Sequence, residues 1–367
     1  MYIPMQIKKL EKGSKYTGEL PMGCRYCRQG RKMVMLITGL CRFSCFYCPL
    51  SEKKKGKDVV YANEKLVEND EDVFYEAKTI DALGSGITGG DPLEVFNRTI
   101  HYIEILKNEF GDEHHIHLYT AYIPNKELLE KLQDANLDEI RFHIPFNYWD
   151  KFSGSEYEST IKDALNTHMS IGVELPALPD FKEELKGLTI QLDDLGVHFL
   201  NLNELEYSET NWHALMSRNY KIRHETSNAI KGSQWVADDI LKEIDCTMSL
   251  HYCSSRFKDG VQLRRRIKRR AKNTRKESDI VTEEGLFIKG IVECDDLGGV
   301  YEQLKERFKI PGELIYIDTE KERIEIAPWI LEEIHRKIEY PCFIVEEYPT
   351  ADRLEVERRP LSWPRHQ

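Results

Sequence analysis

The chain has 367 residues, of which 41% are hydrophobic and 31% are charged, and its formal net charge is −11. This composition indicates a soluble globular protein, and the length allows two domains or one large domain with an appendage. No apolar run approaches the roughly 20 residues of a membrane-spanning helix, and the first residues lack the apolar core of a secretory signal. We therefore expect a cytoplasmic protein without membrane partners.

Strand-like and helix-like stretches alternate from residue 33 to residue 253. The expected helices cover residues 94–110, 125–137 and 181–196. Alternation of this kind predicts parallel strands joined by right-handed crossovers, and therefore an α/β barrel or a doubly wound sheet. The expected strands cover residues 33–38, 84–88, 115–120, 138–145, 170–178, 198–205 and 246–253.

Within four of these strands, polar and apolar side chains alternate. Because neighbouring side chains of a strand point to opposite faces, the apolar faces pack against helices and the polar faces line the interior. Buried polar groups are costly unless they are hydrogen-bonded or wet. The pattern favours a partial barrel that holds a polar ligand, and a polar network without a ligand is the alternative. The inward residues are His117, Tyr119, Arg141, His143, Glu174, Asn201 and Asn203.

Nine cysteines occur in the chain, an odd number that argues against a disulfide framework in the expected compartment. Cys41, Cys45 and Cys48 follow the first strand with the spacing C-x3-C-x2-C, at the strand end where barrel enzymes place their chemistry. Three thiolates would leave one iron of a 4Fe-4S cluster open to an external ligand. A zinc site completed by a distant residue is the alternative.

This segment, with Tyr47 directly before its last cysteine, resembles the cluster loop of the radical S-adenosylmethionine superfamily. Gly89, Gly90 and Asp91, which follow the second strand, resemble the Gly-Gly-Glu segment that holds the methionine amino group in that family. In this chain Asp91 replaces the usual Glu and is one methylene shorter. The resemblance covers residues 33–253. Within the superfamily, the sequence is most similar in general character to the activating enzyme of pyruvate formate-lyase.

The resemblance implies a partial (β/α)6 TIM-like barrel and an enzyme. It implies that a 4Fe-4S cluster, reduced by one electron, cleaves S-adenosylmethionine to methionine and a 5'-deoxyadenosyl radical, which abstracts hydrogen from an unidentified RNA, peptide or metabolite. Such chemistry is anaerobic and uses a low-potential donor such as ferredoxin or flavodoxin. A non-catalytic iron–sulfur carrier and a zinc-dependent nucleic-acid-binding module are the alternatives. The expected cofactor-binding residues are Tyr47, Gly89, Gly90, Asp91, His143, Glu174, Asn201 and Asn203.

A second metal site is a further hypothesis. Cys24 and Cys27 form a C-x2-C pair before the first strand. Cys253 lies in the last expected strand, on the side that faces the interior. We expect the pair to fold over the barrel mouth and to join Cys253 around an iron–sulfur cluster or zinc, with His251, water or substrate as a further ligand. Unrelated free thiols are the alternative.

Residues 256–276 contain eleven Lys or Arg residues and one Asp, with Leu263, Ile267 and Ala271 along one helical face. Such a helix could bind RNA in a salt-dependent manner, bind an acidic partner, or balance an acidic protein without a partner. Beyond it, the expected element order is βαββαβ, which is typical of ferredoxin-like α+β domains. The predicted organisation is an N-terminal segment 1–32, a barrel 33–255, a basic linker 256–279 and a C-terminal domain 280–367.

Overall fold

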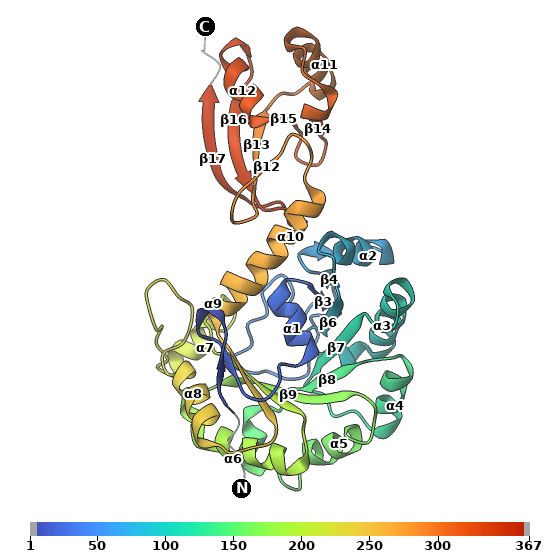
Figure 1. Cartoon of the computed structure of the whole chain (residues 1–367), viewed down its shortest axis with the longest axis vertical. Coiled ribbons are helices and arrows are strands. Elements are labelled where there is room, and N and C mark those ends of the chain that lie inside the picture. The colour runs from blue at the N-terminus through green and yellow to red at the C-terminus, as the bar shows by residue number, and fades with distance from the viewer. Residues whose placement is uncertain (1–5, 363–367) are drawn as a thin grey trace. The chain divides into compact units, whose positions relative to one another are not determined.

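The computed structural model describes residues 6–362 and divides the chain into two compact units, Met1–Leu263 and Arg264–Gln367 (Figure 1). The predicted first and last segments extend beyond the described residues. The strands of the first unit are β1 Lys8–Lys9, β2 Lys15–Tyr16, β3 Lys32–Leu36, β4 Tyr61–Ala62, β5 Lys65–Leu66, β6 Gly84–Thr88, β7 His115–Thr120, β8 Glu139–Phe142, β9 Ser170–Ala177, β10 Phe199–Glu204 and β11 Ser249–Cys253. Its α-helices are α1 Met22–Gln29, α2 Asp70–Thr79, α3 Phe96–Phe110, α4 Lys126–Asp134, α5 Glu156–Ala164, α6 Lys182–Leu195, α7 Trp212–Ser217, α8 Ser233–Glu243 and α9 Ser255–Phe257.

The strands of this unit form one curved sheet in the order β1-β2-β11-β10-β9-β8-β7-β6-β3-β4-β5. The run from β11 to β3 is parallel throughout, and the strands at either side of it pair antiparallel. The parallel run contains all seven strands predicted from the sequence, one more than the (β/α)6 barrel that the resemblance implied, and β11 pairs with β10 after α8 returns the chain. The end strands of this run, β3 and β11, pair with β4 and β2 and not with each other, so the parallel strands do not close into a complete barrel.

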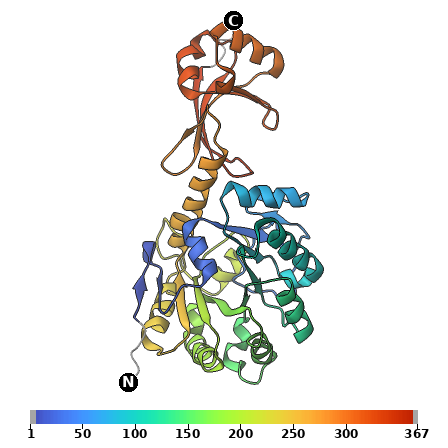
Figure 2. The ribbon, with the colours of Figure 1, turned by 45° about the vertical axis from the view of Figure 1, so that its right-hand side comes forward.

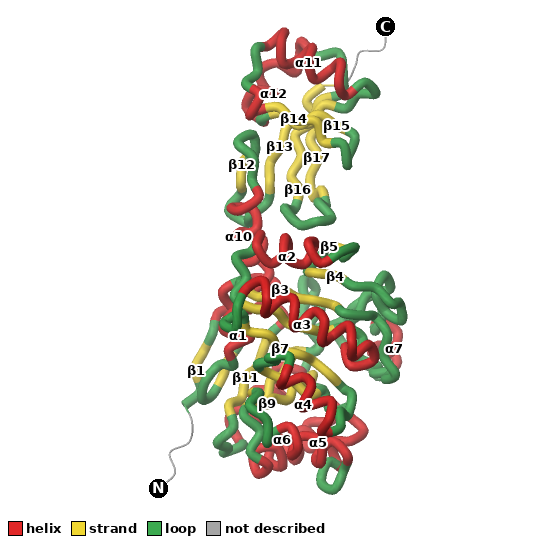
Figure 3. The backbone as a smooth tube through the Cα atoms, turned by 90° about the vertical axis from the view of Figure 1, so that its right-hand side faces the viewer, coloured by secondary structure: helices red, strands yellow, loops and turns green. Residues whose placement is uncertain are grey.

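The outer face of this sheet is apolar and covered by helices, as Figures 2 and 3 show for α3 to α6. Ile140 and Phe142 of β8 and Leu118 of β7 are fully buried in the same apolar core. Helix starts are defined locally: Asn69 and Asp72 form a capping box before α2, and Asn125 caps α4. None of the helices described within residues 6–362 combines the length and hydropathy that crossing a membrane would require.

Helix α1 lies inside the curve of the strands, in contact with β3, β6 and β7 (Figure 1). Its Tyr26 packs edge-on against His115 at the start of β7, and Cys24 reaches Arg141 in β8. The prediction that the C-x2-C pair folds over the mouth was wrong. Two residues, Gly30 and Arg31, link α1 to β3, so the helix must end beside the amino end of that strand.

The second unit is mostly an antiparallel sheet. Its elements are α10 Arg264–Thr274, β12 Ile280–Val281, β13 Phe287–Val292, α11 Leu297–Phe308, β14 Ile315–Asp318, β15 Arg323–Ile326, α12 Pro328–Ile334, β16 Cys342–Glu347 and β17 Glu355–Ser362. From β13 to β16 the element order is the predicted βαββαβ, and the strand order is β14-β15-β13-β16-β17, with β12 paired to β13. Leu331 of α12 and Val300 and Leu304 of α11 pack on one face of this sheet. The basic helix α10 belongs to this unit, and Ile267 and Ala271 of its predicted apolar stripe are buried.

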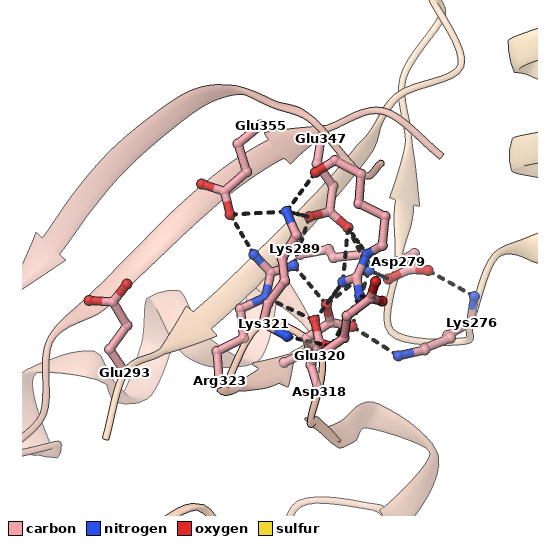
Figure 4. A network of polar contacts seen from close by, with 12 residues as sticks. Lys276, Asp279, Lys289, Glu293, Asp318, Glu320, Lys321, Arg323, Glu347 and Glu355 are labelled. Atoms are coloured by element: carbon pink, nitrogen blue, oxygen red, sulfur yellow. Dashed lines mark hydrogen bonds and ion pairs between the residues drawn. The ribbon is translucent and has the colours of Figure 1, made fainter. Parts of the chain in front are cut away.

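The other face of this sheet carries a network of buried ion pairs (Figure 4). Lys289 of β13 contacts both Glu325 and Glu347, and Arg323 contacts the same two carboxylates. Burial alone would raise the pKa of Glu347, but the positive charges of Lys289 and Arg323 hold it below its usual value. The charges in this sheet compensate one another, which lets four ionised side chains be buried in a small domain.

Candidate active site

The three clustered cysteines lie on the loop that leaves the carboxyl end of β3. Cys41 is exposed, and Cys45 and Cys48 are partly buried. The peptide N–H of Cys48 donates to the carbonyl of Cys45 at 3.1 Å, so these two residues belong to one tight turn. The loop therefore presents three sulfur donors at the end of the sheet where the sequence placed the chemistry.

The loop between β6 and α3 is hydrogen-bonded directly to the start of the cysteine loop. The N–H of Gly90 donates to the carbonyl of Thr38, and the N–H of Asp91 donates to that of Leu40, each at 2.7 Å. A Cβ atom on Gly90 would lie 2.1 Å from the Leu40 oxygen. The two motifs are thus adjacent through their backbones, and the approach requires glycine.

Replacing Gly90 by alanine is expected to force these two loops apart and to lower the rate of S-adenosylmethionine cleavage by about 10- to 100-fold, because displacement of a reacting group by about 1 Å has costs of this order. The measurement is 5'-deoxyadenosine formation by anoxically reconstituted protein. Gly187→Ala is the matched control, since a Cβ atom there would meet nothing within 4 Å. Equal rates for the two variants would contradict the expectation.

The side chain of Asp91 is buried and committed to the protein. Its carboxylate accepts hydrogen bonds from the N–H groups of Leu93, Ala121 and Tyr122 and from the hydroxyl of Thr120, at 2.7–3.0 Å. Each oxygen of the carboxylate accepts two hydrogen bonds, so all four acceptor sites of the group are in use. The carboxylate therefore holds the turn after β7, a use that the resemblance did not indicate.

Tyr47, which belongs to the cysteine loop, is hydrogen-bonded to His143. The Nδ1–H of His143 donates to the carbonyl of Glu174 at 3.1 Å, which leaves Nε2 to accept from the Tyr47 hydroxyl at 2.9 Å. Burial lowers the pKa of His143, so its ring is neutral at pH 7. The residue before the last cysteine is thereby anchored to the residue that follows β8.

Glu174 organises the polar interior. Its carboxylate accepts hydrogen bonds from Arg141, Asn201 and Asn203 at 2.7–2.9 Å. Burial would raise the pKa of Glu174, but the charge of Arg141 and the two amides hold it below its usual value. The prediction that these side chains share the inner face is confirmed, and their roles toward a cofactor stay predictions.

The remaining thiols of interest lie in this interior. Cys24 accepts hydrogen bonds from Asn201 at 3.3 Å and Arg141 at 3.6 Å, and burial raises its pKa to about 12. Cys253 is also buried, and burial raises the pKa of its thiol. Across residues 6–362, no three His, Cys, Asp or Glu side chains are arranged to hold a metal ion, and this applies to the cysteine loop as well as to these thiols.

Several residues that fasten the cysteine loop carried no signal in the sequence. Asn211 donates to the carbonyl of Tyr47 and Thr210 to that of Cys48, both at 3.2 Å. On the opposite side, Asp58 accepts from the Thr38 hydroxyl and pairs with Arg98 of α3. These contacts join segments that are far apart in the chain, so no motif or periodicity marks them.

Comparisons with known proteins agree with this geometry. Residues 35–170 match the model of the Radical SAM superfamily, and residues 285–361 match a domain of unknown function. A protein of Methanocaldococcus jannaschii, named provisionally as a glycyl-radical enzyme activating enzyme, is 41% identical over an alignment of 373 positions that covers 97% of this chain and 97% of the relative.

Identity at this level along nearly the whole of both chains confirms the predicted resemblance and the assignment as an enzyme. The alternatives of an electron carrier and a zinc-dependent module gain no support. Membership implies the use of S-adenosylmethionine and a 4Fe-4S cluster, and the three thiols of the cysteine loop are the type of donor that binds such a cluster. The chain belongs to the radical S-adenosylmethionine superfamily.

Proposed function

We propose that this enzyme activates a partner protein by abstracting a hydrogen atom from a glycine α-carbon. The similarity to the Methanocaldococcus jannaschii protein carries this proposal, because it extends through both units. The rival substrates that the sequence left open are RNA, bound through the basic residues 256–276, and a small metabolite.

In this proposal Cys41, Cys45 and Cys48 hold the cluster, and the backbone of Gly89 and Gly90 receives the methionine end of S-adenosylmethionine. When bound and reduced, the cluster supplies the electron that cleaves this cofactor into methionine and a 5'-deoxyadenosyl radical. Because the Asp91 carboxylate already accepts four hydrogen bonds, Asp91 acts by positioning the turn after β7.

The polar inner face supplies the remaining contacts to the cofactor. Tyr47 and His143 lie beside the cysteine loop, and Glu174, Asn201 and Asn203 lie on neighbouring strands. These side chains offer acceptors and amide donors suited to ribose, carboxylate and adenine groups. Their mutual hydrogen bonds hold them in place before the cofactor arrives, which lowers the cost of binding.

The function is tested with extracts of cells grown on glycine deuterated at the α-carbon. Anoxically reconstituted enzyme, dithionite and S-adenosylmethionine are incubated with the protein, RNA or metabolite fraction. Deuterium in 5'-deoxyadenosine is expected with the protein fraction, and extract labelled on alanine is the control. Stimulation by the RNA fraction alone, sensitive to salt, would replace a protein substrate by RNA.

The second part of the proposal is an auxiliary metal site at Cys24, Cys27 and Cys253. Cys24 and Cys253 are buried and Cys27 is partly buried, and the Nε2 atom of His251 is a buried polar atom that makes no hydrogen bond within residues 6–362. Burial lowers the pKa of His251 to about 4, so its ring is neutral and suited to bind zinc or iron.

Replacing Cys24 or Cys253 by alanine is therefore expected to remove the metal of this site and to leave the loop cluster in place. Iron and zinc contents of the purified variants measure the loss. Cys246→Ala is the control, because that buried thiol donates to the carbonyl of Met248. Retention of the parent's full metal load by both variants would exclude the auxiliary site.

A further inference from the structure

The loop that follows the last clustered cysteine carries a compact positive patch, which we call the lysine loop and define as residues 53–57. Lys53, Lys55 and Lys57 are exposed. Among the described residues, the ammonium groups of these three lysines make no hydrogen bond or ion pair. The lysine loop is a second basic segment, besides residues 256–276, on a chain whose net charge is −11.

The acidic residues near this loop offset only part of its charge. Asp58 is paired with Arg98, and Glu94 is paired with Arg42. Glu52 directly precedes the lysine loop, and the carboxylate of Glu209 accepts from the Glu52 N–H at 2.9 Å. Against these two carboxylates the loop carries four lysines, so its local charge stays positive. The ammonium groups therefore remain available to a partner, and lysine point charges suit transient contacts with carboxylates.

The lysine loop is fixed against the start of the cysteine loop. The N–H of Gly39 donates to the carbonyl of Lys57, and the N–H of Gly56 donates to the carbonyl of Gly39, both at 2.8 Å. A Cβ atom on Gly39 would lie 1.7 Å from the carbonyl oxygen of Lys54, so the two segments are in direct backbone contact. Gly39 is two residues from Cys41, which is itself exposed.

We propose that the lysine loop docks an acidic one-electron carrier protein, so that the carrier's reduced centre is brought beside Cys41. This inference rests on the proposed cluster site. In the encounter the carrier loses one electron and the cluster gains one, with no other bond made or broken. Electrostatic steering raises association rates, and electron-transfer encounters typically bury less than about 1,200 Å² of surface. A patch of three lysines is sufficient for such a contact.

The test compares two reductants on the full-length holoenzyme. The variant Lys53→Glu/Lys55→Glu/Lys57→Glu is assayed for 5'-deoxyadenosine formation with dithionite and with a reduced flavodoxin at low salt. We expect the dithionite-driven rate to stay within about twofold, and the flavodoxin-driven rate to fall by about 10- to 100-fold, the usual range of steering effects. Raising the salt concentration should reduce the parent's flavodoxin-driven rate toward that of the variant.

The control is Lys131→Glu/Lys162→Glu/Lys242→Glu, which reverses three lysines in the last turns of α4, α5 and α8. This variant should respond to both reductants like the parent. Equal losses with dithionite and flavodoxin would overturn the proposal, because the loop would then shape the cluster site itself. An unchanged flavodoxin-driven rate would overturn it too. Failure of the parent enzyme with dithionite would instead contradict the proposed function.

Discussion

Replacing Cys45 by alanine is expected to abolish the loop cluster and to lower 5'-deoxyadenosine formation by about 1,000-fold or more, which corresponds to about 4 kcal/mol of lost transition-state stabilisation. Two thiolates cannot hold a four-iron cluster that already depends on three. Iron content, the electronic spectrum and product formation, all under anoxic conditions, measure the effect.

The variant should remain folded, because Cys45 is a partly buried loop residue. Cys294→Ala is the matched control: Cys294 is also a partly buried cysteine, but it lies in the second unit at the edge of its apolar core. That variant should keep the iron content and the activity of the parent. A Cys45 variant with undiminished iron would show that other residues hold the cluster.

Replacing Arg141 by methionine is expected to cost about 3–5 kcal/mol of folding free energy, because it leaves buried carboxylates without their cation. Arg141 contacts both Glu139 and Glu174, and the side chains of Arg141 and Glu139 are 2% and 1% exposed. For a unit of this size the loss corresponds to a decrease in Tm of about 6–20 °C. Thermal unfolding followed by circular dichroism measures it.

Arg25→Met provides the control, since Arg25 and its partner Glu19 are 43% and 83% exposed. Exposed ion pairs contribute at most about 1 kcal/mol, so Tm should change little. Adding Glu139→Gln to the Arg141 variant should recover part of the loss by removing one uncompensated charge. If the Arg141 and Arg25 variants had the same Tm, the interior network would not be the stabilising feature that its burial indicates.

The positions of the interior side chains could be predicted because strand geometry is local. A period of two residues decides which side chains share a face, so Glu174, Asn201 and Asn203 could be assigned together before their hydrogen bonds were known. The βαββαβ order of the second unit followed from local patterns in the same way. The spacing of Cys41, Cys45 and Cys48, with the Gly-Gly segment one βα unit later, was enough to identify the family.

The sequence by itself therefore determined the family, the parallel strands and the polarity of the barrel's inner face. Only the tertiary structure decided that α1 fills the interior, that Asp91 binds the turn after β7, and that the lysine loop lies against Gly39. These contacts join residues that are far apart in the chain: Cys24 is separated from Arg141 by 117 positions and from Asn201 by 177. Periodicity reports the direction of a side chain within its own element, whereas its partner depends on how the whole chain closes.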